Sequence, residues 1–253
     1  DGARTFNIST AAAFVAAGAG VRVAKHGNRS VSSSCGSADV LAAMGVKIDI
    51  SPERVSECIH STGIGFLFAP LLHASMKYDI GPRRELAIRT FFNILGPLTN
   101  PAGAKRQLLG VYSEALVETV AGVLADLGSV KAYVVHGEDG LDEISTAGGT
   151  RVAEVDRGTV RTYHVVPDDF GLSRAKPSDL EGGDAELNAK LLIGVLDGEK
   201  GPRRDIVLLN AAFAIAAGGR ASSPGDGFTR AVESLDSGAA MDVYLRMREF
   251  TAS

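Results

Sequence analysis

Short β-type runs alternate with helix-type segments through the first half of this chain, and this alternation limits the fold more than any other feature. Helical spacing over residues 11–19 is followed by a β-type run over 20–24, which ends at Lys25. A second helix then opens at Gly36 or Ser37. Helices placed between successive β runs are typical of a mostly parallel sheet with helices packed on its faces.

The same patterns place the remaining elements. Helices are predicted over residues 52–61, 82–95, 114–127, 187–196, 205–217 and 226–247, the last interrupted near 236–238. Further β runs are predicted over residues 63–68, 107–112 and 130–136. Between residues 144 and 166 short β pieces with glycine turns indicate antiparallel hairpins at the sheet edge. The sequence therefore predicts an α/β fold with a mostly parallel central sheet, a small antiparallel elaboration and one domain over residues 1–253.

Composition and charge exclude several classes of protein. With 253 residues and 45% hydrophobic content, the chain can bury a large core. A formal net charge of -4, without a long run of one sign, argues against a surface for nucleic acid or anionic membrane. Cys35 and Cys58 cannot make a disulfide framework, and neither belongs to a C-x-x-C pair. The charge pattern leads us to expect small-molecule partners, and the cysteine usage fits a reducing cytoplasm. No apolar stretch is long enough to span a bilayer.

Three polar segments interrupt the apolar pattern, at residues 25–29, 93–100 and 139–143. Each combines Gly or Pro with Asn, Lys or paired carboxylates, which is typical of turns at the mouth of an α/β sheet. Backbone amides and polar side chains can bind a ligand there, and we expect a phosphorylated one.

The start of the first helix offers a candidate phosphate site. Asn7, Ser9 and Thr10 bring side-chain oxygens beside free N–H groups at the positive end of the helix dipole. Ordinary helix capping is the alternative, because the same residue types open most helices. Lys25 follows the next β run, where its ammonium can reach the same phosphate, and nearby glycine allows a close backbone approach. His26 is weaker evidence, since a lone histidine is more often structural than a ligand.

Asp142 and Glu143 offer a candidate metal site. Adjacent carboxylates in a glycine-containing loop after a β run provide hard oxygen ligands for Mg²⁺, which would hold a diphosphate. A solvated acidic turn is the alternative, and without the segment around Lys25 it explains the pair equally well. The five histidines lie far apart in sequence, so a zinc site is not expected. Neither a G-x-S-x-G elbow nor a G-x-x-x-x-G-K-[ST] loop occurs, so serine-hydrolase and P-loop chemistry lack support.

Two further features have a functional and a structural interpretation. Arg83 and Arg84 open the helix after a Gly-Pro pair, where a guanidinium can bind a carboxylate through two hydrogen bonds. A solvated basic pair is the alternative. Cys35 and Cys58 have no neighbouring pattern of activation, so we expect small, partly buried structural side chains.

Four motifs occur in one order: K-H-G-N-R at 25–29, G-S-A-D at 36–39, F-N-I-L-G-P-L-T-N-P at 92–101 and D-G-L-D-E at 139–143. In this order they resemble anthranilate phosphoribosyltransferase, and the resemblance spans the chain. G-S-A-D alone is also similar to the pyrimidine nucleoside phosphorylases. The resemblance implies that the nitrogen of anthranilate is joined to the ribose of phosphoribosyl pyrophosphate (PRPP), releasing pyrophosphate, in tryptophan biosynthesis.

The resemblance also implies roles for individual residues. PRPP would be bound by Asp1, Gly2, Asn7, Ser9, Thr10, Lys25, Gly27 and Ser37. Anthranilate would lie along His26, Asn28, Pro70, Arg83 and Gly96, with Arg83 at its carboxylate. Mg²⁺ on the pyrophosphate would be held by Ser9, Asp142 and Glu143. No general base is assigned, because fixed electrostatics around the leaving pyrophosphate and positioning of a neutral amine suffice.

The start of the chain departs from the family pattern. Asp1-Gly2-Ala3 resembles the tail of the family's glycine-rich pyrophosphate loop, G-T-G-G-D-G. The family's small N-terminal helical domain precedes that loop and is not in the sequence. We therefore expect weak or absent turnover if nothing precedes Asp1, and a homodimer when the protein is full-length.

Two other functions stay open on sequence alone. A pyrimidine nucleoside phosphorylase would use free phosphate, and both Asn28 and the G-P-L-T-N-P segment disfavour it. A non-catalytic homologue that binds nucleic acid with the same fold is opposed by the acidic charge balance.

Overall fold

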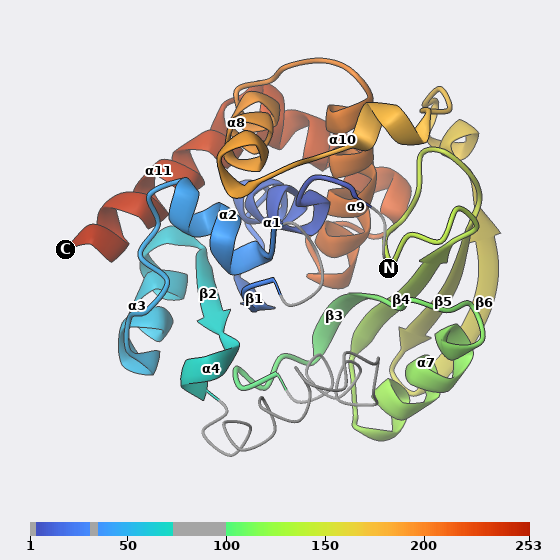
Figure 1. The fold of residues 1–253 in the computed structure, drawn as a ribbon. Helices are drawn as coiled ribbons and strands as arrows, with labels where there is room; N and C mark the ends of the chain where they lie inside the picture. Colours follow the sequence, from blue (N-terminus) through green and yellow to red (C-terminus); the bar gives the residue numbers. More distant parts are fainter. Residues whose placement is uncertain (1–3, 31–34, 73–99) are drawn as a thin grey trace, which may run out of the picture.

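The computed structural model describes residues 4–30, 35–72 and 100–253 (Figure 1). Its α-helices are α1 (Ile8–Gly18), α2 (Ser37–Ala43), α3 (Pro52–Thr62), α4 (Ala69–Leu72), α7 (Leu116–Asp126), α8 (Ala185–Leu196), α9 (Pro202–Ala217), α10 (Pro224–Asp236) and α11 (Ala239–Ala252). Two short 3₁₀ helices, η2 (Pro167–Phe170) and η3 (Pro177–Leu180), precede α8. The strands are β1 (Val23–Gly27), β2 (Ile64–Phe68), β3 (Arg106–Gly110), β4 (Lys131–Gly137), β5 (Thr150–Asp156) and β6 (Thr159–Val165).

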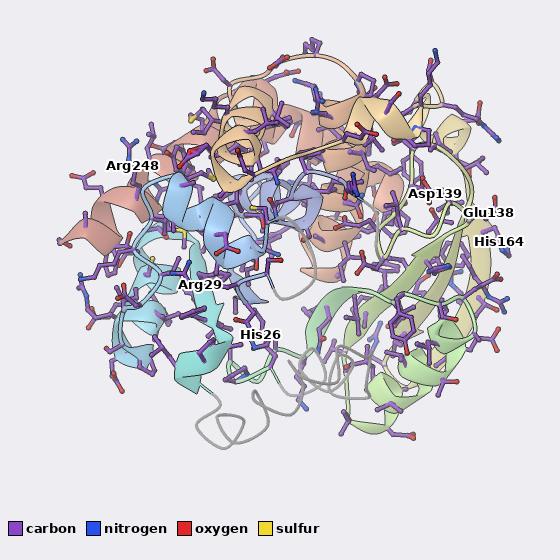
Figure 2. All side chains as sticks on the ribbon, viewed as in Figure 1. His26, Arg29, Glu138, Asp139, His164 and Arg248 are labelled. Atoms are coloured by element: carbon purple, nitrogen blue, oxygen red, sulfur yellow. The ribbon has the colours of Figure 1, made fainter. Side chains whose placement is uncertain are left out.

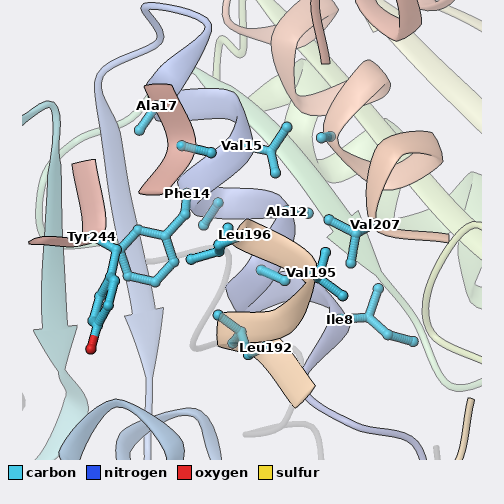
Figure 3. Close-up of a cluster of buried hydrophobic side chains, with 14 of the residues drawn as sticks. Ile8, Ala12, Phe14, Val15, Ala17, Leu192, Val195, Leu196, Val207 and Tyr244 are labelled. Carbon is cyan, nitrogen blue, oxygen red and sulfur yellow. The ribbon is translucent and has the colours of Figure 1, made fainter. Parts of the chain in front are cut away.

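The helix α1 lies at the centre of the larger hydrophobic core (Figure 3). Its alanine-rich sequence lets α8, α9, α10 and α11 pack closely around it, so nearly every side chain from Ile8 to Ala17 is buried. Phe14 meets Tyr244 of α11 edge to face, with 5.9 Å between the ring centroids. Burying one side chain of this size contributes about 1.5–3 kcal/mol. The packing of its buried side chains therefore holds α1 in place.

The strands β1 and β2 pair in parallel, with Lys25 opposite Phe66 and His26 opposite Leu67. The predicted β run over 20–24, with Lys25 after its end, is wrong in position, because Lys25 lies in the middle of β1. Gly20 explains the shift, since it has a φ of 87° and its N–H still bonds the Ala17 carbonyl at the end of α1. The chain leaves the helical turn only after this glycine, and the strand starts later than its apolar pattern suggests.

The strands β3 to β6 form a second, mixed sheet (Figure 1). β3 pairs with β4 in parallel, whereas β4, β5 and β6 are antiparallel neighbours. The β5–β6 turn at Arg157 and Gly158 has positive φ at both residues, 46° and 86°, as a tight hairpin requires. Alternate residues of β4 face opposite sides, so Ala132 and Val134 pack with α7 while Tyr133 and Val135 pack with α9.

The predicted α/β class, with parallel pairing and a small antiparallel elaboration, is confirmed. Among the described residues the strands form two separate hydrogen-bonded sheets, with two parallel and two antiparallel pairs between them. The predicted helices after residue 100 are present, including the break near Ser237, whereas the predicted helix over 82–95 lies outside the described residues. Within the parts of the chain that the structure describes, no helix combines the length and apolar character needed to cross a membrane.

Candidate functional site

The first turn of α1, the strand β1 and the loop between β4 and β5 meet around a cavity of about 940 Å³. Ser9 comes from the helix, Lys25 and His26 from the strand, and Asp142 and Glu143 from the loop. His26 lies in the middle of the view, between β2 and β3 (Figure 2). Polar side chains from three distant parts of the sequence therefore face one space.

Ser9 connects the three segments. Its hydroxyl accepts a hydrogen bond from Lys25 Nζ at 3.2 Å, and its backbone N–H donates to the Glu143 carboxylate. The free N–H groups of the first helical turn favour negative charge, so Glu143 occupies a position that a phosphate could also use. Ser9 and Thr10 were predicted near the helix start and lie inside the first turn of α1.

Burial opposes the charges of both Lys25 and Glu143. Burial and the neighbouring Asp142 carboxylate raise the pKa of Glu143 to about 8, against the opposing effects of Lys25 and the Ser9 N–H. Burial also lowers the pKa of Lys25, although Glu143 and Asp142 act in the opposite direction. Among the described residues, the two carboxylates thus share the ammonium of Lys25, whose charge burial disfavours.

Asn7 occupies the N-cap of α1 but does not cap it through its side chain, so the alternative of ordinary side-chain capping is not observed at Asn7. Its Oδ1 accepts hydrogen bonds from Asn188 Nδ2 at 3.1 Å and from Cys35 Sγ at 3.5 Å. Its Nδ2 donates to the Cys35 carbonyl at 3.4 Å. Asn188 is only 1% exposed, and its Oδ1 accepts from the Gly183 N–H at 2.8 Å. The amide of Asn7 is therefore committed to holding α8 and the start of α2 against α1.

The motifs around residues 27 and 39 have a structural explanation. A Cβ at Gly27 would lie 2.1 Å from Ser37 Oγ and 2.7 Å from Phe66 Cε2, so any larger residue would force these side chains to move. The carbonyl of Asn28 accepts hydrogen bonds from the Ala38 N–H at 3.2 Å and from Ser37 Oγ at 3.5 Å. Asp39 accepts from the Gly36 N–H at 3.0 Å and thereby caps α2.

The structure brings five of the predicted site residues to the cavity: Ser9, Lys25, His26, Asp142 and Glu143. Four predicted residues lie on or directly beside α1 and β1 but not on the cavity wall: Asn7, Thr10, Gly27 and Asn28. Ser37 starts α2 and is not on the cavity wall either. Pro70 lies in α4, directly after β2. Four predicted residues lie outside the described residues: Asp1, Gly2, Arg83 and Gly96. Cys35 and Cys58 are free and buried, as expected, and burial raises the pKa of both thiols.

Sequence reasoning missed Asn210, Asn188 and Gly110 as residues of the site or its support, whereas Asn100 ends the predicted polar segment 93–100. Asn210 and Asn100 line the cavity, and Gly110 contacts the backbone of Asp142. A signal for Asn210 was present, because a single amide inside the apolar run L-L-N-A-A must find buried hydrogen-bond partners. Gly110 carried no such signal, since its close contact is with a segment that follows β4.

The opposite end of the cavity is basic, with Arg22, Lys105, Arg106 and Arg220 in its wall. Arg106 Nη1 donates to the Ala217 carbonyl at 2.8 Å, and Arg220 Nε donates to the Gly20 carbonyl at 2.8 Å. Lys105 Nζ donates to the Leu127 carbonyl at 2.9 Å. These three side chains bind carbonyls at the C-terminal ends of helices, which explains their position without a ligand.

Across the described ranges 4–30, 35–72 and 100–253, no group of three or more His, Cys, Asp or Glu side chains is arranged to hold a metal ion. The candidate metal site consists of the Asp142 and Glu143 carboxylates with the Ser9 hydroxyl. Such a set is incomplete for an oxygen-binding cation, which would take its remaining ligands from substrate oxygens and water.

Residues 1–241 match the model of the glycosyl transferase family, a/b domain. The anthranilate phosphoribosyltransferase of Geotalea daltonii is 56% identical over 251 residues, which cover 99% of this chain and 72% of that relative. The crystal structure of the Thermus thermophilus anthranilate phosphoribosyltransferase superposes with a TM-score of 0.94 at 46% identity, covering 100% of this chain and 75% of the other. The Saccharomyces cerevisiae enzyme in complex with PRPP and Mg gives a TM-score of 0.90 at 31% identity, with 100% and 71% covered.

Proposed function

The chain belongs to the anthranilate phosphoribosyltransferases of the glycosyl transferase family, and we propose that its cavity transfers the phosphoribosyl group of PRPP to anthranilate. The products are N-(5-phosphoribosyl)anthranilate and pyrophosphate. The observation that carries the site assignment is the meeting of Ser9, Lys25, Asp142 and Glu143 in one cavity, although they come from three separate segments. Cations, helix N–H groups and paired carboxylates are the groups that bind a diphosphate and its metal.

Mg²⁺ fits the residues of this site. Ser9, Asp142 and Glu143 supply only oxygen donors, which suit a hard cation, and the S. cerevisiae relative contains Mg with PRPP. The raised pKa of Glu143 indicates a carboxylate that needs more positive charge than Lys25 provides. When bound, Mg²⁺ supplies positive charge that favours departure of pyrophosphate. Ser9, Asp142 and Glu143 are proposed to hold it.

The chain's own groups act mainly by position and charge. The ammonium of Lys25 is fixed beside Ser9 at the start of α1, where it would offset charge on the leaving phosphates. The N–H groups of the first helical turn add partial positive charge without any movement at the moment of reaction. The nitrogen of anthranilate is nucleophilic when neutral, so orientation against the anomeric carbon can replace a strong base. We assign no general base.

The remaining site assignments are part of the proposal. Asn7, Thr10, Gly27 and Ser37, with Asp1 and Gly2, are proposed for PRPP. His26, Asn28 and Pro70, with Arg83 and Gly96, are proposed for anthranilate. Three observations support these sets. Asn7 and Thr10 flank Ser9 at the start of α1, and Gly27 lies on β1 in close contact with Ser37 of α2. His26 lines the cavity beside Lys25.

The pathway, the cellular location, the oligomeric state and the partners of the protein are proposed from its family membership and composition. Family membership supports a role in tryptophan biosynthesis, a cytoplasmic location and a homodimer for the full-length protein. The net charge of -4 supports the absence of a nucleic-acid partner.

The test is loss of anthranilate fluorescence when PRPP and Mg²⁺ are added to protein expressed from the complete reading frame. Residues 1–253 contain no Trp, so this part of the protein contributes little fluorescence of its own. We expect loss that requires both additions. Folded protein without that loss would contradict the proposal, and phosphate-dependent release of uracil or thymine would identify a nucleoside phosphorylase instead.

A further inference from the structure

Asn210 is a buried amide in the middle of an apolar helix. It lies on α9, is 2% exposed and has buried neighbours on both sides, Leu208, Leu209, Ala211 and Ala212. A polar group at such a position destabilises the fold unless its hydrogen bonds are satisfied. The hydrogen-bond partners of Asn210 therefore indicate its structural role.

Asn210 binds both backbone groups of one residue, Ile144. Its Oδ1 accepts from the Ile144 N–H at 2.9 Å, and its Nδ2 donates to the Ile144 carbonyl at 2.9 Å. The second Nδ2 hydrogen has a partner as well, because Nδ2 also donates to the Ile206 carbonyl at 2.9 Å. Ile144 directly follows Glu143, so the amide fixes the backbone at the end of the carboxylate pair.

The same segment is confined from the opposite side by β3. A Cβ at Gly110 would lie 1.5 Å from the Asp142 carbonyl oxygen, so the two backbones are in direct contact. The flanks are also fixed: the Gly137 N–H donates to the Leu141 carbonyl at 2.8 Å, and the Ser145 N–H donates to Thr150 Oγ1 at 2.9 Å. Asp142 and Glu143 thus lie on a short stretch of backbone held between β3 and α9.

We propose that Asn210 is a positioning residue for the Mg²⁺ site, holding the backbone after Glu143 so that both carboxylates face Ser9 and Lys25. This assignment rests on the proposed function. The amide of Asn210 is fully used by Ile144 and Ile206, so its loss should affect the metal requirement before it affects anthranilate. A hydrogen-bonded partner that orients a metal ligand typically changes metal affinity or activity about 10–100-fold when removed.

The test compares wild type with Asn210→Ala by two Mg²⁺ titrations on the full-length protein. One follows turnover at saturating PRPP and anthranilate. The other follows the rise in Tm with PRPP present and anthranilate absent, so that it does not depend on activity. We expect both midpoints to move to about 10–100-fold higher Mg²⁺ in the variant. At saturating Mg²⁺ the KM for anthranilate should stay within about 2-fold of wild type.

A second variant separates positioning from general loss of stability. Ile215→Ala removes buried hydrophobic volume from the same helix without touching the carboxylate loop, so its Mg²⁺ midpoints should match wild type. If Asn210→Ala does not fold, Asn210→Ser keeps a hydroxyl that can accept from Ile144, and a smaller shift in the same direction is expected.

The failure of this inference can be told apart from failure of the proposed function. Wild-type turnover together with unchanged midpoints in a folded Asn210 variant would overturn the positioning role alone. Equal shifts in the Ile215 and Asn210 variants would overturn it too. A wild type with neither turnover nor a Mg²⁺-dependent rise in Tm would overturn the proposed function and this assignment with it.

Discussion

Burial and the neighbouring Asp142 carboxylate both disfavour the negative charge of Glu143, and together they raise the pKa of Glu143 to about 8. Glu143→Gln keeps the size of the side chain but removes the anionic oxygen that a cation binds best. We predict that half-saturation of turnover by Mg²⁺ rises at least about 10-fold. Titration of Mg²⁺ in the anthranilate fluorescence assay measures this.

A control for Glu143 lies in the same loop. Glu138 accepts a hydrogen bond from the Gly149 N–H at 3.0 Å and is not part of the cavity wall among the described residues (Figure 2). Glu138→Gln should therefore leave the Mg²⁺ requirement unchanged. If Glu143→Gln behaves like Glu138→Gln, Glu143 is not a metal ligand.

The hydrogen bonds around Asp39 predict that the free energy of unfolding depends on pH. Burial by itself would raise the pKa of Asp39, but hydrogen bonds from the Ser30 and Gly36 N–H groups and from Arg29 hold the pKa below its ordinary value. A carboxyl whose pKa is lowered by folding stabilises the fold at pH values above its ordinary pKa of 3.8. That stabilisation is lost as the pH falls through the lowered pKa of the folded protein. Asp39→Asn should cost about 1–2 kcal/mol near neutral pH.

The difference in unfolding free energy between wild type and Asp39→Asn should shrink as the pH falls below the ordinary Asp pKa of 3.8. Urea denaturation of both proteins across this pH range measures it. A difference that stays constant with pH would show that Asp39 contributes through packing instead of through its charge.

Charged residues of the site could be predicted from sequence, whereas its supporting amides could not. Lys25, Asp142 and Glu143 stand in glycine-containing polar segments, which are visible locally. Asn210 and Asn188 bond partners 66 and 181 residues away, and no local pattern shows such a pairing. An amide in an apolar helix indicates buried hydrogen bonds but not where they go.

Among the elements, α3 and β2 were predicted within a residue or two, and the β5–β6 hairpin lies inside the predicted antiparallel segment 144–166, because strong local signals mark these elements. Ser51 accepts from the Arg54 N–H at 3.3 Å, Pro52 starts α3, and Gly158 provides positive φ in the hairpin turn. The start of β1 was wrong because Gly20 extends the helical turn before it. The described strands form two sheets because of pairings between residues far apart in the sequence. The local β-type runs do not encode these pairings.

The contact between β1 and α2 predicts a large effect from a small substitution. Gly27→Ala would place a methyl group 2.1 Å from Ser37 Oγ and 2.7 Å from Phe66 Cε2. We expect a loss of about 1–3 kcal/mol in the free energy of unfolding. Gly122→Ala on α7 meets no atom within 4 Å and should gain about 0.5–1 kcal/mol. Chemical denaturation compares the two, and equal effects would show that β1 and α2 do not pack this tightly.

At the scale of the whole molecule, α9 joins the two hydrophobic regions. Val207, Leu208, Ala211 and Ile215 belong to the core around α1, whereas Leu209, Ala212 and Phe213 pack against the β3–β6 sheet. A helix that is apolar on all sides is buried, and the sequence of α9 has that character. The sequence does not show that α9 lies between the core around α1 and the β3–β6 sheet. Both regions are built from segments that are far from α9 in the sequence.

This shared helix supports the proposal that residues 1–253 form one domain, and Phe213→Ala tests it. Phe213 is fully buried and packs edge to face on Tyr133, with 5.1 Å between centroids, so its truncation should cost about 3–5 kcal/mol. Because the chain has no Trp, Tyr244→Trp reports on the α1 core and Tyr163→Trp on the sheet. In one domain, Phe213→Ala lowers the urea midpoint equally for both reporters. A fall confined to the Tyr163→Trp reporter would mean that the sheet and the helical core unfold as separate units.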